Sequence, residues 1–214
     1  MKNKTRGLKV ITMYFFFKRF LDIVLSTCGI LFFIPVSIII KLIYISYRDG
    51  GNILYKQSRI GKDGKIFQIY KFRTMVRDAE EQLDELLKED RYKQEWEANQ
   101  KIENDPRITI IGKFLRESSL DELPQAINVL IGNMSLVGPR PLVEGELEAH
   151  GGNKKYWKVK PGITGWWACH GRSNLDYSER LELEYYYVDN ASFSLDMLCL
   201  FKTFIAVFRQ KGAK

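Results

Sequence analysis

The segment Ile23–Ile40, "IVLSTCGILFFIPVSIII", is an uncharged apolar run, and the arrangement of the whole chain depends on it. As a straight helix it would be about 27 Å long, enough to span the hydrocarbon core of a bilayer. A cleavable signal peptide fits poorly, because the run is long for one and no small-residue cleavage site follows it. Pro35 lies inside the run, where it removes a helical hydrogen bond and predicts a kink or a break.

Basic residues flank this run on both sides, and the positive-inside rule favours both flanks on the cytoplasmic side. A single-pass helix does not satisfy that preference, whereas a helix that breaks at Pro35 and returns from one leaflet does. In such a helix Ser26, Thr27 and Ser37 are candidates to bond the backbone groups that the break frees. Each flanking cation would add on the order of 1 kcal/mol on an anionic leaflet. The flanking cations are Lys2, Lys4, Arg6, Lys9, Lys18 and Arg19 before the run, and Lys41, Arg48, Lys56, Arg59 and Lys62 after it.

We therefore predict three parts: a basic N-terminal tail over 1–17, a re-entrant membrane helix over 18–47, and a cytoplasmic domain over 48–214. A length of 214 residues suits one domain with such an appendage. The fold class that we expect is a mixed α/β domain, mainly helical with a small sheet, in a monotopic membrane protein.

The charge is unevenly placed. Residues 1–73 contain 14 Lys and Arg against 3 acidic residues, a net charge of +11, while the remainder has 19 against 23, a net charge of −4. A basic third indicates contact with phosphate, in lipid head groups, nucleotides or nucleic acid. Because these cations surround an apolar run, lipid explains them better, and we expect no nucleic-acid partner.

Cysteine and histidine are scarce. The three cysteines are odd in number and form no Cys-x-x-Cys pair, which argues against a disulfide framework or a zinc site. The two histidines, His150 and His170, poorly supply a histidine base or a histidine-rich metal site.

The globular part begins with a predicted strand in "GKIFQIYKFRTM" (residues 64–75). Alternation along this strand puts Phe67, Ile69, Lys71 and Arg73 on one face. A Lys and an Arg that follow two apolar residues on this face suit the binding of a diphosphate. The same pattern is equally expected where a strand simply ends in solvent. The charge pattern of segment 77–105 predicts one or two surface helices. We expect this segment to serve substrate specificity or dimer formation. The last stretch, "LDMLCLFKTFIAVFRQKGAK", predicts an amphipathic helix, either in the core or along the membrane.

An acidic pair, Asp121 and Glu122, lies in "ESSLDELPQAINVL" just before Pro124. If Asp121 is the N-cap of a helix over 123–131, the proline falls in the first turn, where no donor is needed. A capping box of Ser119 with Glu122 is the alternative, and it places the proline less favourably. At a helix start the macrodipole would keep Asp121 ionised, as a nucleophile must be, and would attract phosphate.

Arginines on stiff loops are good bidentate phosphate ligands. Arg140 lies in "GPRP" between Pro139 and Pro141, and Arg172 lies in the loop "CHGRSN". A second rigid turn, "KPGITG", occurs at 160–165.

Taken in order, these segments resemble the bacterial sugar transferases, or monotopic phosphoglycosyl transferases, from about Lys18 to the C-terminus. The resemblance rests on "KRFLDIV" with the later proline, "YKQSRIGKDGKIFQIYKFRTM", "DPRITIIGKFLRESSLDELPQ", "NMSLVGPRPL" and "VKPGITGWW". It implies transfer of a sugar-1-phosphate from a UDP-sugar to polyprenyl (undecaprenyl) phosphate with release of UMP. The chain has no extra N-terminal transmembrane domain of the kind that larger members carry, so we expect a minimal version.

The resemblance also implies the roles of individual residues. Asp121 matches the family nucleophile, which forms an aspartyl-phosphosugar intermediate, and Glu122 assists it, with Mg²⁺ at the pair. Pro35 matches the kink of the re-entrant helix, and further amphipathic helices lie at the membrane interface. The candidate substrate-binding residues are Lys71, Arg73, Arg107, Arg116, Pro139, Arg140 and Arg172.

The implied location is the cytoplasmic face of a bacterial inner membrane, in the assembly of an exopolysaccharide, capsule, O-antigen or glycoprotein glycan. Downstream glycosyltransferases and a second copy of the chain are further candidate partners. Two alternatives stay open: a metal-dependent glycosyltransferase that releases UDP, and a non-catalytic membrane-anchored assembly protein whose acidic pair is a helix cap. The sugar is also open, among galactose, glucose, N-acetylgalactosamine and a bacillosamine-like sugar.

Overall fold

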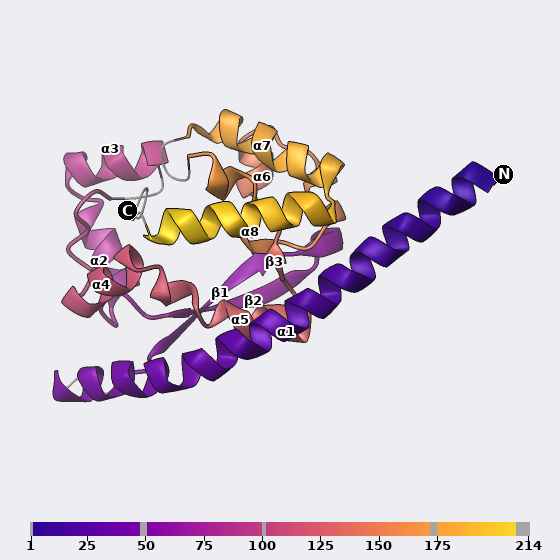
Figure 1. Cartoon of the computed structure of the whole chain (residues 1–214). Helices are drawn as coiled ribbons and strands as arrows, with labels where there is room; N and C mark the ends of the chain where they lie inside the picture. Colours follow the sequence, from indigo (N-terminus) through magenta and orange to yellow (C-terminus); the bar gives the residue numbers. More distant parts are fainter. Residues whose placement is uncertain (1, 48–50, 100–101, 172–174, 209–214) are drawn as a thin grey trace.

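The computed structural model describes residues 2–47, 51–99, 102–171 and 175–208. It is a mixed α/β fold, mainly helical with small sheets, as predicted (Figure 1). Short 3₁₀ turns join several elements, among them η2 (Leu120–Glu122) and η4 (Trp167–Cys169). The helices are α1 (Lys2–Ser46), α2 (Ala79–Leu86), α3 (Asp90–Asn99), α4 (Ile110–Glu117), α5 (Gln125–Ile131), α6 (Glu146–Ala149), α7 (Tyr177–Asn190) and α8 (Phe193–Phe208), and the strands are β1 (Leu54–Ile60), β2 (Ile66–Phe72), β3 (Ser135–Val137) and β4 (Gly162–Thr164).

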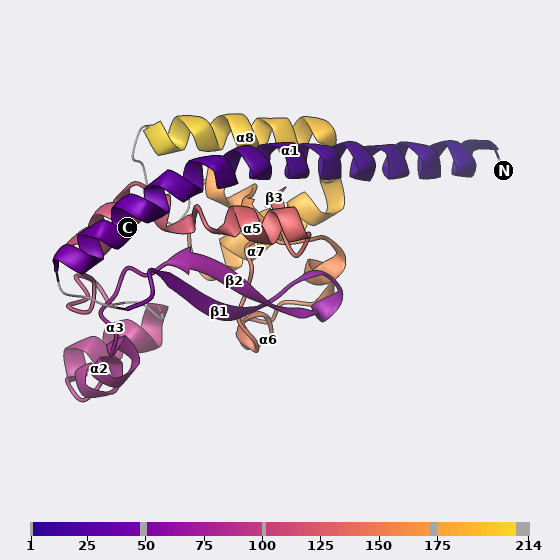
Figure 2. The same ribbon diagram turned by 90° about the horizontal axis from the view of Figure 1, so that it is seen from below.

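Helix α1 contains the whole apolar run and continues through Pro35, so the two predicted arms belong to one helix. It bends along its length in both views (Figures 1 and 2). Pro35 has no N–H to donate to the carbonyl of Leu31. The three hydroxyls expected to relieve a break instead bond other carbonyls of the helix: Ser26 and Thr27 donate to Ile23, and Ser37 donates to Phe33.

One stripe of α1 is buried against the domain on both sides of Pro35. Asp22 and Ser26 are buried before it, and Ile40 and Tyr44 after it. The other faces are apolar and exposed, and only 11% of the most apolar window within 13–46 is buried. This helix is long and apolar enough to cross a membrane, which makes the fold compatible with membrane association.

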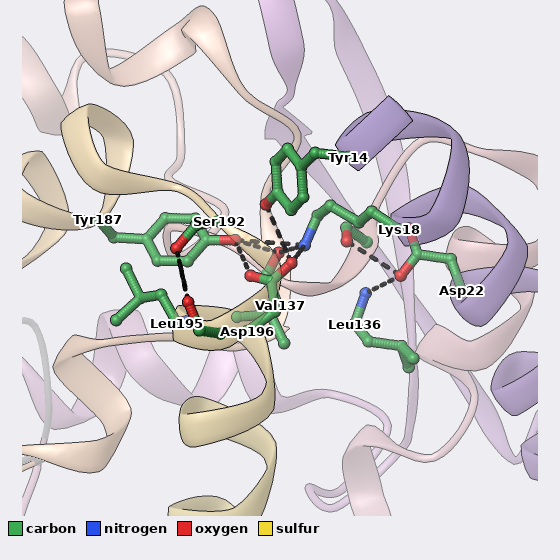
Figure 3. A network of polar contacts seen from close by, with 11 residues as sticks. Tyr14, Lys18, Asp22, Leu136, Val137, Tyr187, Ser192, Leu195 and Asp196 are labelled. Carbon is green, nitrogen blue, oxygen red and sulfur yellow. Dashed lines mark hydrogen bonds and ion pairs between the residues drawn. The ribbon is translucent and has the colours of Figure 1, made fainter. Parts of the chain in front are cut away.

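Two cations of α1 bind the protein itself. The Lys18 ammonium lies 2.8 Å from the Asp196 carboxylate of α8 and donates to the Val137 carbonyl at the end of β3. Figure 3 shows this network, in which Tyr14 and Tyr187 also donate to Asp196. Arg19 donates to the last carbonyls of α5, a favourable place for a cation. These two cations, which we expected to face lipid head groups, thus also attach α1 to the domain.

Two small sheets carry the loops of interest. β1 and β2 pair antiparallel, and β2 confirms the predicted strand, with Phe67 and Ile69 buried. β3 and β4 pair in parallel and bring the two rigid turns together. A Cβ on Gly138 would lie 2.4 Å from the Lys160 carbonyl oxygen, and one on Gly162 would lie 2.1 Å from the Gly138 nitrogen. Glycine is required at both positions for this close approach.

The remaining predicted helices are also present. Helices α2 and α3 occupy the charged segment 77–105, on the side away from α1 in Figure 2. Helix α8 buries Cys199 and Asp196 on one face and exposes Phe201 and Phe204 on another. It lies on the same side of the sheets as α1 in Figure 2, so it both packs in the core and adds to an exposed apolar surface.

Candidate active site

The acidic pair lies in η2, one turn before α5, and not at the cap of that helix. Helix α5 begins at Gln125 with Pro124 as its N-cap, and Ser119 makes no side-chain capping bond. Both predicted caps are therefore wrong. Ser119 instead adopts a left-handed backbone with φ 56°, which is uncommon outside glycine and marks a constrained turn before the pair.

The two carboxylates have opposite electrostatic environments. Burial, with the charge of Glu122 second, raises the pKa of Asp121 to about 6. Burial also disfavours ionised Glu122, but the Lys71 ammonium, 3.0 Å away, together with Arg140 and Gln125, outweighs it and holds the pKa of that carboxyl below its usual range. The helix macrodipole therefore does not set the state of Asp121 as we expected; burial dominates, and the carboxylate is still mostly ionised at pH 7.

Cations surround the pair from three separate elements. Lys71 comes from β2, and its charge acts on both carboxylates. Arg116 at the end of α4 acts on Asp121, and its Nε donates to the Thr74 hydroxyl at 2.9 Å. Arg140 acts on Glu122. The structure thus brings together five of the predicted residues around one turn.

Arg140 is held by its own backbone. Its N–H donates to the buried Glu184 carboxylate at 2.8 Å, and its carbonyl accepts from the Tyr156 hydroxyl at 2.9 Å. The neighbouring Pro139 is buried, and its carbonyl accepts from the N–H of Gly162. Pro139 therefore fixes the turn rather than offering a side chain to a ligand.

Two predicted arginines are engaged elsewhere. Arg107 is buried, forms a two-point ion pair with Asp105, and donates to the Ala79 carbonyl. Its charge lowers the pKa of Arg116, so the two cations oppose each other, and we assign Arg107 to the fold rather than to the site. Arg73 follows β2, stacks over the Tyr44 ring at 4.6 Å, and donates to the Asn52 carbonyl. Arg172 lies outside the described residues.

Sequence reasoning missed the residues that support Arg140. Glu184 is fully buried, and burial raises its pKa to about 7. It lies in "LELEYYY" of α7, where nothing distinguishes it from the neighbouring acids of the same helix. Arg180, which also lies near Arg140, carries no local motif either, and Arg59 was expected to serve the membrane rather than this site.

The acidic pair fits a magnesium ion by its chemistry. Among the described residues no group of three or more His, Cys, Asp or Glu could hold a metal. Mg²⁺ needs no such group, because it uses one or two carboxylates together with substrate phosphates. The Glu122 side chain is 38% exposed, so one carboxylate of the pair is open to a ligand.

A membrane-associated α/β domain with a carboxylate pair among cations defines a class of protein built to handle phosphate groups next to a lipid surface. The model of the bacterial sugar transferases matches residues 13–210, and the chain belongs to that family. It is 47% identical to an undecaprenyl-phosphate galactose phosphotransferase of Salmonella typhimurium, over 92% of this chain and 42% of that protein.

Two further relatives differ in how much of their own length this chain covers. The chain is 38% identical to the UDP-glucose:undecaprenyl-phosphate glucose-1-phosphate transferase of Escherichia coli, over 92% of this chain and 41% of that protein. It is 40% identical to the exopolysaccharide production protein ExoY of Rhizobium meliloti, over 92% of this chain and 87% of that protein. The chain therefore spans less than half of some relatives and most of others.

Proposed function

We propose that the protein transfers a sugar-1-phosphate from a UDP-sugar to polyprenyl phosphate and releases UMP. The observation that carries this proposal is the position of Asp121: a mostly ionised carboxylate, half-buried, with Arg116 and Lys71 close enough to act on its charge. Positioned cations supply most of the stabilisation in phosphoryl transfer. The names of the Salmonella and Escherichia relatives support the same donor and acceptor classes.

The reaction proceeds in two displacements. In the first, a carboxylate oxygen of Asp121 attacks the β-phosphorus, the bond to the bridging oxygen breaks, and UMP leaves with that electron pair. In the second, a phosphate oxygen of the polyprenyl phosphate attacks the same phosphorus, and the Asp121 carboxylate is released. A covalent intermediate of this kind divides one difficult displacement into two easier ones. The product then passes to glycosyltransferases that extend the glycan.

Asp121 and Glu122 would hold a magnesium ion, which supplies neutralisation of diphosphate charge when bound. Lys71, Arg116 and Arg140 orient the phosphate groups around the pair. Glu122, kept ionised by Lys71, steers the metal or the incoming acceptor phosphate.

We also propose a monotopic arrangement at the cytoplasmic face of the inner membrane. Asp22 accepts from the Leu136 N–H, and Tyr44 donates to the Arg73 carbonyl, so residues on both sides of Pro35 are attached to one domain. A helix that crossed the bilayer would carry the polar domain into the hydrocarbon with it. Membrane entry and return on one side avoids that cost.

The first test is the identity of the released nucleotide. Purified protein is incubated with Mg²⁺, undecaprenyl phosphate and a panel of UDP-sugars that includes UDP-galactose and UDP-glucose. We expect UMP. Release of UDP would instead support the alternative metal-dependent glycosyltransferase, and it would end the Asp121 mechanism.

The nucleophile is tested by Asp121→Asn. We expect turnover to fall by about a thousandfold or more, because the amide is not a nucleophile. Asp84→Asn, on the exposed face of α2, is the matched control and should keep full turnover. A folded Asp121→Asn protein with unchanged turnover would contradict the role.

Metal removal gives a further expected outcome. Chelation with EDTA should lower turnover by about a hundredfold or more, because no metal then offsets the diphosphate charge. Added Mg²⁺ should restore turnover. Turnover that continues at its full rate in EDTA would contradict the metal-assisted reaction.

A further inference from the structure

Three arginines from distant parts of the chain converge beside the site. Arg59 comes from β1, Arg140 from the rigid turn after β3, and Arg180 from α7. The guanidinium carbons of Arg140 and Arg180 lie 5.9 Å and 4.9 Å from the centroid of the same Trp167 ring. The Arg59 charge interacts with both of these arginines, and we call the three arginines together with Trp167 the arginine recess.

The recess contains two cationic donors that lack a hydrogen-bond partner, although the Nη1 and Nη2 groups of Arg59 donate to the Pro141 carbonyl and to the Gln57 side chain. The side chains of Arg59 and Arg180 are only 12% and 14% exposed. Their nearest carboxylate is Glu146, which lies 3.9 Å from each, beyond hydrogen-bond distance. Arg59 Nε and Arg180 Nη2 are buried and have no hydrogen-bond partner within the described chain. Leaving such donors unpaired is unfavourable, and a ligand that accepted hydrogen bonds from them would remove that cost.

The three positive charges also oppose one another. Burial, with the Arg140 charge second, lowers the pKa of Arg59, and burial with the Arg180 charge lowers that of Arg140. Glu184, the other nearby carboxyl, has a pKa raised to about 7 and compensates only in part. A folded chain that holds repelling guanidinium groups together is prepared for an anion, as preorganised phosphate sites are.

The recess adjoins the acidic pair on the side away from the membrane helix. Arg140 belongs to both, since its charge also acts on Glu122. In Figure 2, α6, which begins at Glu146, lies on the side of the molecule opposite α1. A side that faces away from the apolar helix favours a soluble nucleotide over a phosphate anchored in the bilayer.

We propose that Arg59 and Arg180, together with Arg140, bind the phosphate of the nucleotide part of the donor, the part that leaves as a nucleoside monophosphate. This inference rests on the proposed function and names two positioning residues for it. The planar fork of Arg180 suits a phosphate monoester through paired hydrogen bonds, and Arg59 offers its unpaired Nε–H.

The test measures UMP binding by calorimetry, which requires no turnover. Wild-type protein should bind UMP, and Arg59→Gln and Arg180→Gln should each weaken that binding by about tenfold or more. Arg180→Lys keeps the charge without the fork and should fall between wild type and Arg180→Gln. Arg91→Gln on exposed α3 is the matched control and should bind like wild type.

The steady-state constants separate nucleotide from lipid. With the donor varied, KM should rise in the Arg59 and Arg180 variants, while KM for undecaprenyl phosphate should stay within about twofold. A rise confined to the lipid KM would overturn the proposal and assign the recess to the acceptor. Unchanged UMP affinity in folded Arg59→Gln and Arg180→Lys would also overturn it.

These outcomes remain distinguishable from failure of the proposed function. If the protein bound UMP through Arg59 and Arg180 but released UDP from its donor, the role of the recess would stand and the phosphosugar mechanism would be rejected. A protein that released UMP in turnover with arginine variants of wild-type affinity would keep the mechanism and lose the recess.

Discussion

At the scale of single residues, the two adjacent carboxylates differ because their neighbours differ. Burial and the charge of Glu122 raise the pKa of Asp121, whereas Lys71 at 3.0 Å helps to lower the pKa of Glu122. Environments that push two pKa values apart commonly separate the roles of a pair. Here they favour Asp121 as the more basic, more reactive oxygen and Glu122 as a permanently charged ligand.

Glu184 carries a pH-dependent stability that can be measured. Its pKa is about 7 in the folded protein against an ordinary value of 4.5, so the folded state holds a proton that the unfolded state releases earlier. The resulting stabilisation is complete below pH 4.5 and is lost as pH rises through about 7, up to about 3 kcal/mol. Glu184→Gln keeps an acceptor for Arg140 and removes the titration.

We therefore expect Glu184→Gln to unfold near the wild-type temperature at pH 5 and above it at pH 8. Thermal unfolding in detergent at both values checks this. Equal slopes of unfolding temperature against pH in the two proteins would contradict the assignment.

The sequence predicted part of this site and not the rest, for physical reasons. Asp121, Glu122 and Arg140 lie in short local motifs that made them candidates, and the family resemblance added Arg116 and the role of the pair. Glu184 and the other two arginines of the recess act through contacts between residues far apart in the chain, which no local pattern records. The raised pKa of Asp121 likewise depends on burial, which appears only in the folded chain.

At the scale of elements, α1 is attached to the domain by two adjacent cations. Lys18 reaches the end of β3 and Asp196 of α8, and Arg19 caps α5. Figure 3 shows how Asp196 collects Tyr14, Lys18 and Tyr187 in one network. Because the Asp196 side chain is only 5% exposed, loss of its cation leaves a buried charge without compensation.

Lys18→Met should therefore lower the free energy of unfolding by about 3–5 kcal/mol. Lys88→Met, which removes a 68% exposed partner of Glu85, is the control and should cost about 0–1 kcal/mol. Adding Asp196→Asn to Lys18→Met should recover part of the loss, because the uncompensated charge is gone. Additive costs in this double-mutant cycle, measured by unfolding in detergent, would argue against the ion pair.

Element type was easier to predict than element boundary. The alternation of β2 and the charge pattern of α2 and α3 are local signals, and both were confirmed. The start of α5 was misplaced by two residues because a 3₁₀ turn carries the acidic pair instead. The continuity of α1 through Pro35 and the parallel pairing of β3 with β4 depend on tertiary packing.

At the scale of the whole molecule, exposed apolar side chains gather on three helices. α1 exposes many along its length, α8 exposes Phe201 and Phe204, and α4 exposes Ile110 and Phe114, at 84% and 56%. A monomeric soluble protein rarely exposes so much apolar surface. With α6 on the side opposite α1 in Figure 2, this distribution supports a protein lying on one face of a bilayer.

That arrangement predicts that both ends of the apolar helix lie on the same side of the membrane. Met13 and Tyr47, 59% and 69% exposed, flank the segment and can each be replaced by cysteine in a Cys28→Ser background. A membrane-impermeant maleimide should label both in inverted vesicles and neither in spheroplasts, as judged by peptide mapping. Asp84→Cys on α2 reports the side of the domain and should follow the same pattern. Labelling of the two positions from opposite sides would mean that α1 crosses the bilayer, which the attachment of the domain along both halves of this helix disfavours.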